Sequence, residues 1–265
     1  MGAIQAIDDG RNINFKFQTT DMETHARHLH KAPGKKWNHY LFEFFMLFLA
    51  VFCGFIAENE REHFVEHQRE KQYAKMLLTD IRGDTAFINA MTISNIDLMK
   101  GLDSLAVALD TLKSYDKVQL GRIYYLFYTW GYTPYIVKFS ERALSQLKSA
   151  GGMRLIRKQN VSDAINIYYT GVGMSDEQAK VYFDDQNTII NLSYKLFDKL
   201  YLLKGHENME LAKSMMVENR ALVREFTNRT MDLKEVIANY NQLLAQMKTI
   251  GMNLDKHIKK EYHFE

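Results

Sequence analysis

The chain has 265 residues, 46% hydrophobic and 25% charged, proportions that are typical of a folded protein and exclude a disordered one. The 34 basic residues nearly balance the 32 acidic ones, so we expect no nucleic-acid partner. Only two prolines interrupt possible helices, and the single cysteine, Cys53, excludes an internal disulfide.

A polar tail at the start of the chain is followed by a strongly apolar segment. Residues 1–36 contain glycine and show no sustained periodicity, which predicts a flexible tail. The stretch 40–57, YLFEFFMLFLAVFCGFIA, carries a single charge. Extended to Trp37 as an interfacial anchor, it is long enough to cross a hydrocarbon core of about 30 Å. We therefore predict a transmembrane helix over residues 37–57, with the lipid bilayer as a partner.

The charges that flank this segment favour one orientation. Lys31, Lys35 and Lys36 lie before it, whereas only Arg61 lies equally close after it. Because cytoplasmic flanks are enriched in lysine and arginine, the tail is expected in the cytoplasm. The chain would then cross the cytoplasmic (inner) membrane once and carry its C-terminal domain in the periplasm of a Gram-negative cell.

One side of the apolar segment combines an acidic residue with small residues. Spacings of four and three place on a common stripe Glu43, Leu47, Ala50, Gly54 and Ala57. Ala50 and Gly54 form a small-xxx-small pair, which lets neighbouring helices approach closely. The stripe predicts a homo-oligomer in which Glu43 lies at a helix contact or lines a pore. The alternative is that Glu43 lies near enough to the interface to reach the headgroups.

The remaining chain reads as helical throughout. Residues 58–83 are helix formers with charges nearly all round, which predicts a helical stalk. Residues 84–265 show no strand alternation and no glycine-rich phosphate loop, so we predict an all-α fold with an extramembrane helical bundle. Helices are expected over 84–114, 118–130, 139–150, 161–170 and 175–203, followed by a last long helix that includes 226–258.

Two seams and two helix ends follow from local patterns. Leucines over 98–112 and mainly apolar residues over 226–258 keep spacings of four and three, as in a coiled coil. Gly151 is expected to end the helix that precedes it. Ser175 and Gln178 make a capping box, which predicts that a new helix begins there.

Aromatic side chains crowd the stretch 124–139, which contains no acidic residue. Aromatic residues at helical spacing are most often core residues. Such a dense group is also suited to line a pocket for a small molecule, glycan or peptide. The candidate lining residues are Tyr124, Tyr128, Trp130, Tyr132 and Tyr135.

His63, Glu66 and His67 match the H-x-x-E-H pattern of inverted zincins. The two histidines lie four residues apart on one helix face, where they could bind zinc with Glu66 as the base. So short a pattern also arises by chance in a charged helix, and the sequence indicates no enclosing pocket. We interpret it as a solvated charged face, and we expect no metal, no cofactor and no enzymatic activity.

Two stretches together resemble a known family. One is FEFFMLFLAVFCGFIAEN at 42–59, with Glu43 near its start, followed by LLTDIRGD at 77–84. The other is SERALSQLKSAGGMRLIRKQNVSDAINIYY at 140–169. The chain resembles the uncharacterised single-span envelope proteins of Bacteroidota, whose N-terminal transmembrane helix contains an acidic residue. The resemblance implies a single-pass topology and a bacterial envelope location, and it implies no particular activity.

Together these features favour a non-enzymatic, homo-oligomeric integral membrane protein that acts as a scaffold or as a pore. The alternative is a periplasmic ligand-binding or sensing module on a membrane anchor, with the aromatic residues as its pocket. Neither interpretation names a specific envelope partner.

Overall fold

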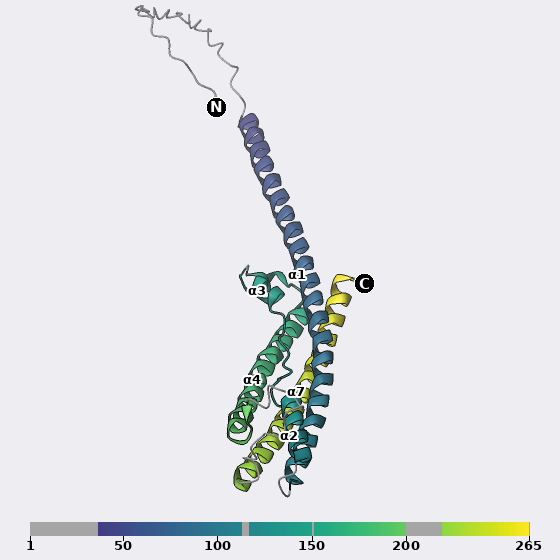
Figure 1. The fold of residues 1–265 in the computed structure, drawn as a ribbon. Helices are drawn as coiled ribbons and strands as arrows, with labels where there is room; N and C mark the ends of the chain where they lie inside the picture. The colour runs from purple at the N-terminus through teal and green to yellow at the C-terminus, as the bar shows by residue number, and fades with distance from the viewer. Residues whose placement is uncertain (1–36, 113–116, 150, 200–218, 265) are drawn as a thin grey trace, which may run out of the picture. The chain divides into compact units, whose positions relative to one another are not determined.

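The computed structural model describes residues 37–112, 117–149, 151–199 and 219–264 (Figure 1). Within these ranges all regular structure is helical, which confirms the predicted all-α fold. The elements are α1 (Trp37–Asp110), α2 (Lys117–Trp130), α3 (Arg142–Ser149), a short 3-10 turn η1 (Gly152–Leu155), α4 (Gln159–Leu196) and α7 (Arg220–Tyr262). The predicted tail over 1–36 lies outside the described residues.

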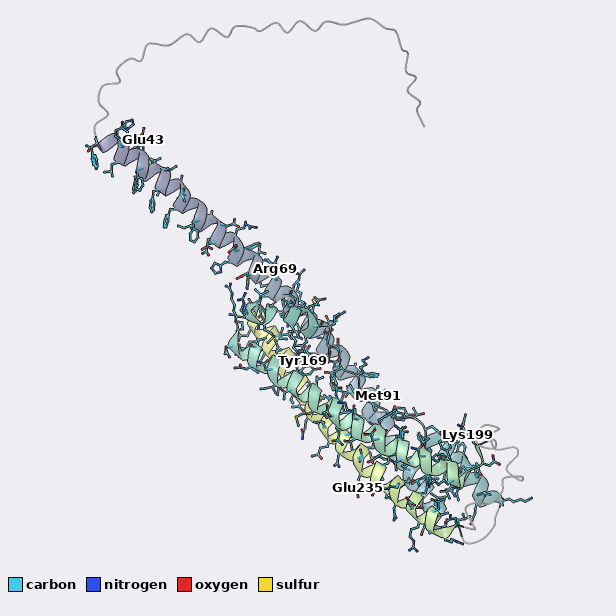
Figure 2. All side chains as sticks on the ribbon, turned by 90° about the vertical axis from the view of Figure 1, so that its left-hand side faces the viewer. Glu43, Arg69, Met91, Tyr169, Lys199 and Glu235 are labelled. Carbon is cyan, nitrogen blue, oxygen red and sulfur yellow. The ribbon has the colours of Figure 1, made fainter. Side chains whose placement is uncertain are left out.

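The chain divides into two compact units, Met1–Glu58 and Asn59–Glu265. The described part of the first unit is the beginning of α1, and every one of its residues is exposed. Side chains project from all sides of this helix, as Figure 2 shows around Glu43. The second unit is a helical bundle with a continuous apolar core.

The bundle core follows the two predicted seams. Along α7, the ten positions at spacings of four and three from Phe226 to Ile258 are all buried. In α1 and just beyond it, the leucines from Leu98 to Leu112 are buried in the same way. A stripe of this spacing stays on one side of a helix, so burying it joins the long helices along their length.

The long helices α1, α4 and α7 lie side by side in the bundle (Figure 1). Two ion pairs fix the antiparallel register of α1 and α7, because Arg82 contacts Asp255 at 3.3 Å and Asp103 contacts Lys234 at 2.6 Å. The helices α4 and α7 are antiparallel as well, since Asn160 near the start of α4 donates to Glu261 near the end of α7.

The segment 131–141, between α2 and α3, has no regular secondary structure, yet Val137 and Phe139 are part of the core. We call this segment the connector. Because a buried backbone without regular structure must find other hydrogen-bond partners, side chains from the long helices have to supply them. These side chains are described with the candidate site.

The two helices expected over 161–170 and 175–203 are one helix, α4, and the predicted capping box is wrong. Ser175 is buried in mid-helix, and its hydroxyl donates to the Gly171 carbonyl oxygen at 3.0 Å. Gly171 lies inside the same helix, and Met247 of α7 packs closely against it: a Cβ there would lie 2.3 Å from the Met247 sulfur. The described helix ends at Leu196, before the expected end at 203.

Of the two predicted ends of the helix over 139–150, the structure agrees with one. Gly151 has a left-handed φ of 62° just after α3, as expected for a glycine that ends a helix. Helix α3 begins at Arg142 and not at 139, because the preceding residues belong to the connector.

The packed bundle begins earlier than the predicted boundary at residue 84. Within the range 58–83 that was predicted as a stalk, the structure buries Glu70, Ala74, Leu77, Leu78, Asp80 and Ile81. Only the part before Glu70 matches the description of a helix that is polar all round. Glu70 and Asp80 are charged residues on this buried face, so a search for regularly spaced apolar residues did not detect it.

Candidate functional site

The most exposed apolar surface of the described chain lies at the beginning of α1. This helix is the one in the described residues that is long and apolar enough to cross a membrane, and none of its apolar window is buried. Its exposed residues include five phenylalanines, Phe44, Phe45, Phe48, Phe52 and Phe55. The first part of α1 is therefore a candidate membrane span.

The acidic residue of this segment has a partner within its own helix. One turn earlier in α1, the His39 Nε2 atom lies 3.2 Å from Glu43 Oε1, and both side chains are about half exposed. Leu47, Ala50 and Ala57 are exposed, and a Cβ on Gly54 would meet no atom within 4 Å. This leaves the side of the helix that carries Gly54 open, while its role in helix packing stays a prediction.

The five aromatic candidates have different surroundings. Tyr124 is fully buried, and its hydroxyl accepts a hydrogen bond from the Asp198 backbone N–H at 2.8 Å. Tyr128 is 55% exposed. Trp130, Tyr132 and Tyr135 are half-buried against the core.

The aromatic packing centres on a residue outside that set. The ring of Phe127 stacks on Phe197 at 4.6 Å between centroids and also contacts Tyr132 and Phe226. Most of the aromatic segment thus forms core, and Tyr128 lies apart from the buried rings.

The residues of the H-x-x-E-H pattern contact basic and acidic neighbours. Arg157 forms an ion pair with Glu66, and its guanidinium lies 3.3 Å from the His63 Nδ1 atom. His67 lies 3.4 Å from the carboxylate of Glu70. No group of three or more possible metal ligands occurs among the described residues.

Three buried carboxylates that the sequence did not single out lie along α1. Each accepts a hydrogen bond from a backbone N–H of the chain between α2 and α4. Glu70 accepts from Arg157, Asp80 from Ala143 and Asp84 from Ser140, at 2.8 to 2.9 Å. We call Glu70, Asp80 and Asp84 the carboxylate clamp.

Each carboxylate of the clamp has a second donor. The Tyr262 hydroxyl donates to Glu70 at 2.7 Å, the Arg142 guanidinium to Asp80 at 2.8 Å and the Tyr168 hydroxyl to Asp84 at 2.6 Å. The Asp80 side chain also contacts the first turn of α3. There a carboxylate can accept from N–H groups that have no partner within the helix, and its negative charge interacts favourably with the helix dipole. The clamp thereby fixes the beginning of α3 and the backbone just before α4.

Burial shifts the proton affinities inside the clamp. The loss of solvent raises the pKa of Asp84, although hydrogen bonds from Tyr168 and Ser140 oppose the rise. Burial and the hydrogen bond to Asp84 together raise the pKa of Tyr168. Both side chains are buried and hydrogen-bonded within the chain, so their geometry fits a structural role in holding the chain between α2 and α4.

A second polar cluster, formed by Asn95, Tyr182 and Tyr240, binds the connector by hydrogen bonds. The Asn95 side chain donates to the Tyr135 carbonyl oxygen at 3.0 Å and accepts from the Tyr182 hydroxyl at 3.2 Å. The Val137 N–H donates to the Tyr240 hydroxyl at 2.9 Å. Burial raises the pKa of Tyr240 to about 12, so its hydroxyl remains neutral and able to accept.

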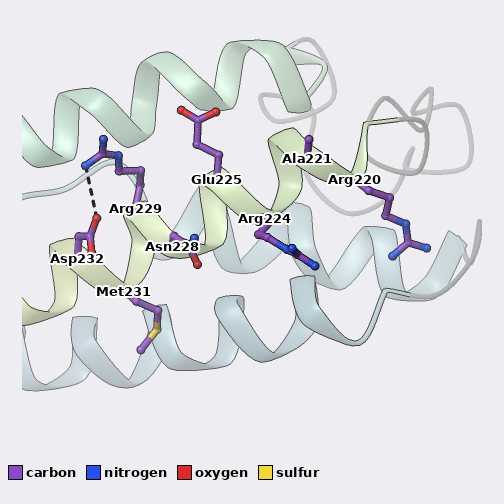
Figure 3. A pocket seen from close by; sticks show the side chains of 8 residues that line it. All are labelled: Arg220, Ala221, Arg224, Glu225, Asn228, Arg229, Met231 and Asp232. Carbon is purple, nitrogen blue, oxygen red and sulfur yellow. Dashed lines mark hydrogen bonds and ion pairs between the residues drawn. The ribbon is translucent and has the colours of Figure 1, made fainter.

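One cavity of the described surface surrounds the beginning of α7 (Figure 3). Its lining side chains all come from this helix: Arg220, Ala221, Arg224, Glu225, Asn228, Arg229, Met231 and Asp232. They point to different sides of α7, with Glu225 and Arg224 on opposite sides (Figure 3). Arg229 pairs with Asp232, and Arg220 donates to the Leu112 carbonyl oxygen. These side chains do not converge on one ligand position.

A second cavity, of about 390 Å³, lies between α1 and α7. Thr85, Ala86 and Asn89 line it from α1, and Gly251 and Met252 from α7. The ion pair between Arg82 and Asp255 crosses its end. Its lining combines small, apolar, polar and charged side chains.

Fold and surface together define a helical-bundle protein, with one candidate membrane-spanning segment in the part of the chain that the structure describes. Comparison of the chain with protein-family models, with curated proteins and with solved structures finds no match.

Proposed function

We propose that the chain is a single-pass protein of the bacterial inner membrane and a non-enzymatic homo-oligomeric scaffold. Its tail would lie in the cytoplasm and its helical bundle in the periplasm. The observation that carries the proposal is the complete exposure of the apolar segment at the beginning of α1.

The apolar side chains of this segment are more stable in a bilayer than in water. Removing one large apolar side chain from water is worth about 1.5–3 kcal/mol. Five exposed phenylalanines and their leucine neighbours would therefore make the segment strongly unfavourable in water. A bilayer core solvates the side chains, while the helix satisfies its own backbone hydrogen bonds.

The oligomer would form through the stripe that contains Ala50 and Gly54. Small residues let two helix backbones approach closely in lipid, where packing contacts and not water exclusion drive association. A scaffold is favoured over a pore because His39 gives Glu43 a partner in its own chain, at the end of the segment expected near the headgroups. The carboxylate then needs no water-filled lumen.

The test is the mass of the full chain in mild detergent, measured by light scattering. Gly54→Leu places a large side chain in the proposed contact, and Phe52→Leu is the matched control on the opposite side of the helix. We expect a defined oligomer for the wild type and the control, and a smaller species for Gly54→Leu. A wild-type monomer would refute the oligomer, and equal masses for all three would refute this contact.

A further inference from the structure

The part of α1 inside the bundle has an exposed face without charge. Six of its exposed residues over 83–96 are apolar or small: Gly83, Ala86, Phe87, Ala90, Ile93 and Ile96. The seventh exposed residue is Asn89. We call these seven residues the α1 face. Ile93 is 62% exposed, although an isoleucine is usually among the most buried residues of a protein.

Charges return at both ends of the α1 face. Arg82 precedes it and is paired with Asp255, and Asp97 follows it and is paired with Lys100. Nearer the chain's beginning, the exposed positions of the same helix include charged residues such as Arg61, Glu62, Arg69 and Lys75. The exposed surface over positions 83–96 is therefore uncharged, in contrast to the charged surface of α1 directly before and after it, and it lies within the second unit alone.

We propose that the α1 face is the contact between the periplasmic bundles of two copies of this chain, whose α1 helices pack in parallel. The parallel direction rests on the proposed membrane anchoring, because two chains inserted in one membrane with the same orientation must run the same way. The face itself is independent of the contact proposed within the span.

The absence of charge is what points to a second copy as the occupant. In a parallel two-fold pair each residue at the centre of the contact lies opposite or next to its own copy, so a charge there would meet a like charge. An unrelated partner could instead offer opposite charges and would need no uncharged face. Within the second unit, the α1 face is the longest part of the exposed α1 surface that is free of charge, as the centre of a parallel self-contact requires.

The sizes of the side chains fit such a contact. A Cβ on Gly83 would meet no atom of its own chain within 4 Å, so the helix is open to close approach there. Ala86 and Ala90 lie one turn apart and continue this small surface, while Phe87 and Ile93 supply apolar area around it. Asn89 can pair with its own copy, as single asparagines do in parallel coiled coils.

The first test is disulfide trapping in the full chain within native membranes. Replacing the only cysteine, Cys53→Ser, gives a background in which Gly83→Cys and Ile93→Cys are made singly. We expect both to form a cross-linked dimer on mild oxidation, and the exposed control Thr188→Cys on α4 to remain monomeric. Failure of both α1 variants, or equal linking of the control, would overturn the proposal.

Disulfide trapping also tests whether the two α1 helices run parallel or antiparallel. An antiparallel pair centred on the face would bring Gly83 near the partner's Ile96 region, so Gly83→Cys alone would not link while a mixture of Gly83→Cys and Ile96→Cys would. That result would overturn the parallel arrangement.

The second test uses charge. Ile93→Lys and Ile93→Glu each place two like charges in a parallel contact, so each is expected to lose the Gly83→Cys cross-link. Co-expression of the two variants should restore it, because position 93 then meets an opposite charge. Loss without restoration would overturn the proposal. All variants should remain in the membrane fraction; a wild-type chain found outside that fraction would refute the anchoring and not the α1 face.

Discussion

At the scale of single residues, Asp80 is the side chain on which the position of α3 depends most directly. It is buried and accepts hydrogen bonds from the Arg142 guanidinium and the Ala143 N–H. In Asp80→Ala both donors lose their acceptor, and an unsatisfied buried N–H costs about 1–3 kcal/mol. We expect a loss of that size in the free energy of unfolding, measured by urea denaturation.

The matched control for Asp80 is Asp103→Ala on the same helix. Asp103 pairs with Lys234 near the surface, and exposed ion pairs contribute less than about 1 kcal/mol. If the two variants were equally destabilised, the burial of Asp80 would not be what makes it important.

Because the pKa of Asp84 is raised by burial, we expect the free energy of unfolding to depend on pH. Desolvation raises its pKa in the folded chain, so the folded state keeps the proton to a higher pH than the unfolded state. The contribution of Asp84 to stability is therefore largest below its ordinary pKa and declines as the pH rises through the folded pKa. Relative to Asp84→Asn, which cannot ionise, the wild type should lose stability as the pH rises above about 4, the ordinary pKa of an aspartic acid.

The measurement is urea denaturation of both proteins at several pH values. Tyr168→Phe should make the decline steeper, because it removes a hydrogen bond that favours the ionised carboxylate. A wild type that gains stability over Asp84→Asn as the pH rises would contradict the assignment.

At the scale of elements, two glycines of α1 have opposite roles. A Cβ on Gly101 would lie 2.3 Å from the Trp130 ring, whereas a Cβ on Gly83 would meet nothing within 4 Å. Overpacking costs about 1–3 kcal/mol and should outweigh the better helix propensity of alanine, which is about 1 kcal/mol. We expect Gly101→Ala to lower the melting temperature and Gly83→Ala to leave it unchanged or raise it.

Circular dichroism of the two glycine variants in parallel measures both effects. A stable Gly101→Ala would mean that α2 does not pack against α1 at Trp130. The same comparison checks that Gly83 is open, which the trapping experiment at this position requires.

At the scale of the whole molecule, the division into two units predicts that the bundle folds without the apolar segment. The fragment 59–265 lacks the five exposed phenylalanines of the apolar segment and keeps the described core. We expect it to remain in aqueous solution with a helical circular dichroism spectrum, while the full chain requires detergent. A fragment that aggregates or loses its helices would show that the bundle depends on the first unit.

Periodicity in the sequence was sufficient for the all-α class, the exposed apolar segment and the two seams. These features are local, because spacings of four and three fix one side of a helix whatever lies opposite. The seam of α1 in fact begins well before Leu98. Glu70, Ala74, Leu77, Ile81 and Asp84 already keep the same spacing, and reading the acidic positions as part of it would have identified two of the three clamp residues, Glu70 and Asp84.

Only the tertiary structure decided which polar residues are buried and where the connector runs. Ser175 lies inside α4 and donates to the Gly171 carbonyl oxygen, while Met247, far away in the chain, packs against Gly171. The clamp likewise depends on donors 56 to 192 residues away from their acceptors. The sequence by itself determined the helices and the apolar segment, because these depend on local spacing and composition. It could not determine the buried polar contacts, because the hydrogen bonds that offset the cost of burial come from distant parts of the chain.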